Sequence, residues 1–137
     1  GGVFDSLLRI GLGRANWAEY YTGLYAPDAK GWTQAVAAMR ELAAYCRANG
    51  VKLALVNYPE LRDLKNYRFH ELDRRLARIA GELDIGYLSL LGSVADVDAE
   101  KLWVTRPDPH PTGQANLLFA QSIFDYLRKE HIAPRAP

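Results

Sequence analysis

The chain has 137 residues, the length of one ordinary domain, of which 49% are hydrophobic and 24% are charged. This composition is typical of a folded globular protein and excludes a disordered or fibrous chain. The formal net charge of +1 gives no electrostatic basis for binding nucleic acid or an anionic membrane. No apolar run approaches the ~20 residues that a membrane span needs, and no signal peptide is predicted, so the cell compartment is left open.

Helix and strand patterns alternate along the chain. Apolar residues at steps of three and four predict helices, and short apolar runs between turn residues predict strands. The predicted helices cover 1–10, 15–25, 32–48, 69–83 and 112–129, and the predicted strands cover 51–57 and 85–90. The segment 91–102 is expected to be a polar loop with one helical turn near its end. Strand, helix and strand in succession imply a parallel crossover, so the expected fold class is α/β.

The helix patterns also predict which side chains are buried. Cys46 lies on the apolar stripe of helix 32–48, so a buried structural thiol is expected, and Asn49-Gly50 should end that helix. The charged residues of helix 69–83 are assigned to its solvated face: Glu71, Asp73, Arg74, Arg75 and Arg78. The inward face of helix 112–129 is expected to hold Ala115, Leu118, Phe119, Ser122, Ile123, Tyr126 and Leu127.

An acid and a base lie between prolines near the C-terminus. Asp108 and His110 each precede a proline, which keeps both residues out of the α region and in extended backbone. Residues two apart in an extended segment project to the same side. The carboxylate of Asp108 can therefore meet the imidazole of His110, as a general-base histidine requires. The alternative is a rigid loop with a surface histidine ahead of a helix.

The predicted topology supports a site at the same place. Asn57 ends the first predicted strand, and the chain that leaves the second strand after Leu90 carries Asp108 and His110. Parallel strands end at the same edge of a sheet, and functional groups of open α/β sheets gather beyond that edge. The acid and the base are therefore expected at the carboxyl ends of the strands.

The block Asp108-Pro109-His110-Pro111, followed by Gly113 and Ala120 in the last helix, resembles the final block of the SGNH (GDSL-type) hydrolases. In that family the block supplies the acid and the base of a Ser-His-Asp triad, so the resemblance assigns these roles to Asp108 and His110. It also implies a three-layer α/β/α sandwich with a parallel sheet, as in flavodoxin-like folds. The order of helices and strands over most of 32–127 is similar to the second half of that fold.

The family's nucleophile block and the glycine and asparagine of its oxyanion hole have no clear counterpart in the chain. The resemblance therefore implies that residues 1–137 are the C-terminal part of one SGNH hydrolase-like domain lacking its N-terminal strands. A single separate domain is the other interpretation. Ser6 follows Phe4-Asp5, but no buried apolar strand precedes it and Phe4 replaces the turn glycine. Ser6 is expected to be a solvent-facing or capping residue, and the isolated chain to be nearly inactive.

The function implied by the resemblance is that of an esterase, lipase or acylhydrolase acting on a small ester or an acylated carbohydrate. An O-acyltransferase of the same fold and a non-catalytic α/β binding or interaction module are the alternatives. No cofactor and no metal are expected, since Asp108, His110 and Asp125 lack the spacing of zinc ligands and the chain has no second cysteine. A sheet of two strands leaves an open edge, so self-association or pairing with the missing N-terminal part is expected.

The remaining polar candidates are expected to lie at the surface. His70 and His131 are interpreted as surface residues, one near the start of a charged helix and the other in the C-terminal tail. Glu60 and Asp63 lie in the loop after the first strand and are expected to be solvated.

Overall fold

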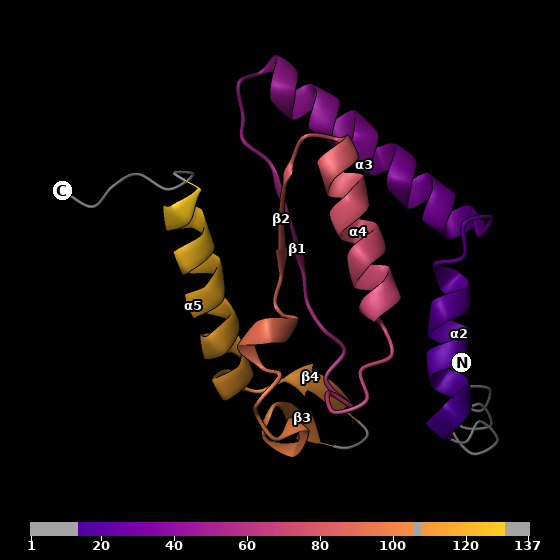
Figure 1. The fold of residues 1–137 in the computed structure, drawn as a ribbon, viewed down its shortest axis with the longest axis vertical. Helices are drawn as coiled ribbons and strands as arrows, with labels where there is room; N and C mark the ends of the chain where they lie inside the picture. Colours follow the sequence, from indigo (N-terminus) through magenta and orange to yellow (C-terminus); the bar gives the residue numbers. More distant parts are fainter. Residues whose placement is uncertain (1–13, 106–107, 131–137) are drawn as a thin grey trace. The chain divides into compact units, whose positions relative to one another are not determined.

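The computed structural model describes residues 14–105 and 108–130 of the chain (Figure 1). The fold divides into two compact units, Gly1–Glu41 and Leu42–Pro137, which are described separately. The predicted helix 1–10 and Ser6 lie outside the described residues.

The first unit contains helix α2 (Arg14–Leu24) and the beginning of helix α3 (Lys30–Ala48), which confirms both predicted helices. Ala18 and Trp32 are buried, and the ring of Tyr25 lies edge-on to Trp32 at a centroid distance of 5.7 Å. Tyr25 follows α2, whereas Tyr20 and Tyr21 within that helix are 60% and 41% exposed.

The second unit begins with the last residues of α3, which end as the sequence predicts. Gly50 adopts a positive φ of 66°, and the N–H of Val51 donates to the carbonyl of Cys46 at 2.8 Å. This bond closes a Schellman motif, for which glycine is suited because it has no Cβ. Cys46 is 7% exposed, so the expected buried thiol is confirmed.

A small parallel sheet forms the centre of this unit. Strand β1 (Ala54–Asn57) pairs with strand β2 (Gly86–Ser89), and helix α4 (His70–Glu82) connects them. Asn57 lies opposite Ser89 in the register, so both strands end at the same edge. Helix α4 and the last helix, α5 (Gly113–Lys129), lie on either side of the strands (Figure 1). The mixed α/β class is confirmed.

The predicted inward face of α5 agrees with the structure. Ala115 and Phe119 are buried, and the other five expected positions are half-buried. Thr112 caps the helix as predicted, since its Oγ1 accepts the N–H of Ala115 at 3.3 Å.

The segment between β2 and the hairpin that follows has the helical turn expected near its end, at η2, but it is not the polar loop that the sequence predicted. It contains two short 3₁₀ helices, η1 (Leu91–Ser93) and η2 (Ala99–Lys101), and it buries Val94 and Leu102 completely. These side chains complete the core of the unit, which consists of Leu61, Leu64, Leu90, Val94, Leu102, Ala115 and Phe119. These apolar residues are isolated in a polar segment and have no helix or strand periodicity, so their burial could not be predicted from the sequence.

None of the helices in the described ranges is long and apolar enough to cross a membrane.

Replacing Leu102 with alanine should destabilise the protein by about 2–5 kcal/mol, because the side chain is fully buried and its truncation removes apolar contacts and leaves a cavity. Leu117→Ala is the matched control, because Leu117 is 71% exposed and its loss should change stability by about 0.5 kcal/mol or less. Urea unfolding followed by circular dichroism measures both values. Equal effects of the two substitutions would contradict the assignment of Leu102 to the core.

Candidate functional site

Asp108 and His110 lie on a β-hairpin, which the sequence did not predict. Strands β3 (Trp103–Thr105) and β4 (Asp108–Pro111) pair antiparallel, with Trp103 opposite Pro111 and an irregular register toward Thr105. The extended backbone predicted for Asp108 and His110 is confirmed, since both belong to β4. The hairpin itself was missed because three residues and a proline-rich segment carry no recognisable strand pattern.

The base of the hairpin is tied to the elements on both sides of it. The N–H of Thr112 donates to the carbonyl of Leu102 at 2.8 Å, and its hydroxyl donates to the carbonyl of Lys101 at 3.0 Å. The same hydroxyl oxygen caps α5. Thr112 therefore connects the end of β4 to η2 and to α5. These bonds fix the position of β4 relative to the core of the unit.

One carboxylate oxygen of Asp108 makes two contacts with the same residue. Oδ1 of Asp108 lies within hydrogen-bond distance of Nδ1 of His110, and it also accepts the backbone N–H of His110 at 3.1 Å. The backbone N–H of Asp108 in turn donates to Oγ1 of Thr105 at 3.2 Å. The expectation that the two side chains meet is thus confirmed, while their catalytic role stays a prediction.

The contacts of Asp108 determine its charge state. The hydrogen bond with the His110 side chain, followed by that with the His110 backbone N–H, holds the pKa of the Asp108 carboxyl below its usual value. An ionised Asp108 facing Nδ1 favours the tautomer that carries its proton on Nδ1 and leaves the lone pair of Nε2 available. The arrangement can therefore accept a proton at Nε2.

The pair is open to its surroundings. The side chain of His110 is 84% exposed and that of Asp108 is 50% exposed. Solvent weakens the attraction between such groups, so the pair contributes little to stability. A second molecule or another part of the polypeptide can reach the imidazole. The hairpin lies beyond the carboxyl ends of β1 and β2 (Figure 1), as the topology predicted.

A second polar cluster lies where the strands end, and it corrects one prediction. Asp73 was assigned to the solvated face of its helix, but its Oδ1 accepts the side-chain N–H of Asn57 at 2.7 Å and the hydroxyl of Tyr87 at 2.6 Å. Burial raises the pKa of Asp73, but hydrogen bonds from Tyr87, Asn57 and Ser89 outweigh it and hold the pKa below its usual value. Asp73 thus connects α4 to both strands. The helix pattern could not reveal this, because the donors come from other elements.

The prediction for Glu60 was also wrong. Its side chain is only 23% exposed, and burial raises the pKa of its carboxyl despite the bonds from Arg62, whose Nη1 lies 2.8 Å from Oε1. Burial likewise raises the pKa of nearby Tyr67 to about 12. Asp63 and His70 are exposed, as expected. His131 lies outside the described residues.

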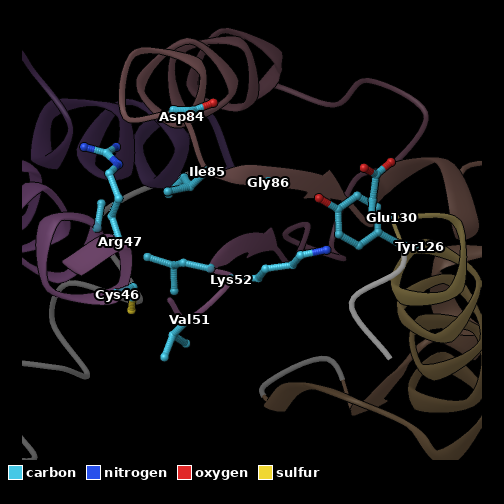
Figure 2. Close-up of a pocket in the computed structure, with 11 residues that line it drawn as sticks. Cys46, Arg47, Val51, Lys52, Asp84, Ile85, Gly86, Tyr126 and Glu130 are labelled. Carbon is cyan, nitrogen blue, oxygen red and sulfur yellow. The ribbon is translucent and has the colours of Figure 1, made fainter. Parts of the chain in front are cut away.

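A pocket of about 350 Å³ lies at the other end of the strands (Figure 2). Its lining includes Cys46, Arg47, Lys52, Gly86, Tyr126 and Glu130. The Arg47 guanidinium at its rim donates to the carbonyl of Leu83 at 2.6 Å, which ties α3 to the end of α4. Since β1 and β2 begin at this end, the pocket is separate from the Asp108–His110 pair. In the described ranges, no group of three or more His, Cys, Asp or Glu residues could hold a metal ion.

No protein-family model matches the chain, and neither a curated protein nor a solved structure matches it.

Replacing His110 with alanine should raise the pKa of Asp108 part of the way to its usual value. The ring contact is lost, but the backbone N–H of residue 110 still donates to the carboxylate. Carbon-13 NMR titration of the carboxyl group measures this shift. Glu71 is the control: Arg74 lowers its pKa, and this pKa should not change when His110 is replaced. An unaltered Asp108 midpoint would show that the ring contact is absent in solution.

Replacing Asp73 with asparagine should make the free energy of unfolding depend less on pH in the acidic range. Because the folded-state pKa of Asp73 lies below the unfolded value, its carboxylate contributes stability that is fully present above about pH 4. That contribution is lost as the pH falls through the folded-state pKa. The melting temperatures of the two proteins should therefore differ at neutral pH and converge in acid. Parallel curves over the whole pH range would contradict the role of Asp73.

Proposed function

We propose that this chain supplies the acid–base half of an SGNH/GDSL-type serine ester hydrolase, with His110 as the base and Asp108 as its partner. The contact between Oδ1 of Asp108 and Nδ1 of His110, on an exposed hairpin at the carboxyl ends of parallel strands, carries the proposal. Helices on either side of the strands are consistent with part of a three-layer α/β/α sandwich (Figure 1).

In the proposed reaction, Nε2 of His110 removes the hydroxyl proton of a serine as its oxygen attacks the carbonyl carbon of an ester. Asp108 stabilises the imidazolium that forms. The imidazolium then protonates the alkoxide that leaves when the carbon–oxygen bond of the ester breaks. The same imidazole then removes a proton from water as the water oxygen attacks the acyl-serine carbonyl. The bond between the acyl carbon and the serine oxygen breaks, the imidazolium returns the proton to that oxygen, and the carboxylic acid is released. General-base action of this kind contributes about 10²–10⁴-fold to the rate.

The proposal requires groups that the pair does not provide. A nucleophilic serine must approach Nε2, and backbone or side-chain N–H donors must bind the oxyanion. These groups are assigned to the N-terminal part of the domain. The exposure of His110 is compatible with this division, since the imidazole is accessible from outside the unit.

Labelling with a fluorophosphonate probe tests the proposal on the full-length polypeptide that contains this chain. The serine should be labelled, and His110→Ala should abolish labelling because the hydroxyl loses its base. Asp108→Asn should lower kcat for ester hydrolysis by about 10⁴-fold with a small change in KM, because the wrong tautomer is stabilised.

His70→Ala is the matched control, since His70 is an exposed histidine whose ring lies 5.2 Å from that of Tyr67, on another element than the hairpin. Its labelling should equal that of the unsubstituted protein. A folded protein that is not labelled, or whose labelling survives His110→Ala, would contradict the proposal and favour a non-catalytic binding module.

A further inference from the structure

The exposed face of the hairpin places an apolar side chain beside the imidazole. Trp103 and Pro111 lie opposite each other in the register, and both are half-buried. Successive side chains of a strand point to opposite faces, so Val104 and His110 share the other face. Their exposure agrees with this placement, since Val104 is 56% exposed and the side chain of His110 is 84% exposed. A small molecule that contacts Val104 can therefore reach the ring of His110.

The two histidines of the described ranges differ in the groups around their rings. The carboxylate of Asp108 contacts Nδ1 of His110, which keeps the ring proton there and leaves the lone pair on Nε2. His70 is also exposed, but in the part of the chain that the structure describes its ring lies against Tyr67 and has no hydrogen bond to a carboxylate. Of the two, His110 alone has a bonded carboxylate that stabilises a positive charge developing on the ring.

An accessible imidazole nitrogen with a lone pair is a nucleophile as well as a base. It can attack an ester carbonyl directly and form a covalent acyl-imidazole, without a serine. Such an attack succeeds when the leaving oxygen departs as a weakly basic anion, because the leaving group then needs no proton. Aryl esters meet this condition, whereas alkyl esters do not, since an alkoxide requires a general acid. The aryl or acyl part of the ester is apolar and suits a site next to Val104.

We infer that Nε2 of His110 itself accepts an acyl group from aryl esters, and that Val104 contacts the apolar part of the ester. The lone pair of Nε2 attacks the carbonyl carbon, the bond from that carbon to the aryl oxygen breaks, and the aryl oxide leaves with the electron pair. Asp108 stabilises the positively charged acyl-imidazole through Nδ1–H.

Water completes the reaction and regenerates the histidine. The water oxygen attacks the acyl carbon and loses a proton to the solvent. The bond between the acyl carbon and Nε2 then breaks, its electron pair returns to Nε2, and the carboxylic acid is released. No serine takes part in these steps, so this activity goes beyond the proposed function and does not depend on it.

Release of p-nitrophenolate from p-nitrophenyl acetate by the chain of residues 1–137 tests this inference. His110→Ala should lower kcat/KM about tenfold, and Asp108→Asn about two- to fivefold, because solvent limits the effect of an exposed carboxylate. Val104→Ser should lower kcat/KM about two- to fourfold through lost apolar contact. His70→Ala is the matched control and should leave the rate unchanged. The rates in H₂O and D₂O should be nearly equal, because no proton moves when Nε2 attacks.

Three outcomes would overturn the inference, provided that circular dichroism shows each variant to be folded. Equal losses on replacing His110 and His70 would reveal only the ordinary reactivity of surface histidines. A rate that falls markedly in D₂O would show that the imidazole deprotonates water and is not acylated. An unchanged rate for Val104→Ser would remove Val104 from the site. None of these outcomes decides the proposed function, which depends on serine labelling in the full-length polypeptide.

Discussion

The candidate site depends on one carboxylate oxygen that binds the backbone and the side chain of the same histidine. Oδ1 of Asp108 accepts the backbone N–H of His110 and contacts Nδ1 of its ring, so one atom holds both the main chain and the imidazole. Two prolines keep the intervening backbone extended, which makes this double contact possible. The contact between the Asp108 carboxylate and the His110 ring therefore depends mainly on the spacing of these two residues.

The packing of the core next to the hairpin determines the orientation of the Asp108–His110 pair. Leu90, Val94, Leu102 and Phe119 are almost completely buried and come from the chain after β2 and from α5. Thr112 connects β4 to that core through bonds to Lys101 and Leu102. A change deep in the core would thus reorient the imidazole without touching either catalytic candidate.

Local signals in the sequence predicted the mixed α/β class and the contact between Asp108 and His110. The helices of the described residues, the short apolar segments that form β1 and β2, the Gly50 end of α3 and the extended Asp108–His110 segment all have local sequence signals. The β3–β4 hairpin, the buried Val94 and the bonds of Asp73 depend on residues far apart in the chain. Periodicity and turn chemistry carry no information about such distant partners, so the sequence could not reveal them.

The closeness of Asp108 and His110 in the chain has a consequence for folding. Contacts between residues near in sequence close small loops and form quickly, whereas pairing of distant strands is slow. The acid–base pair can therefore assemble as soon as β4 is extended, before the sheet around it is complete. On the proposed function, the rate at which activity appears would then be limited by the slower pairing of distant segments and not by the assembly of the Asp108–His110 contact.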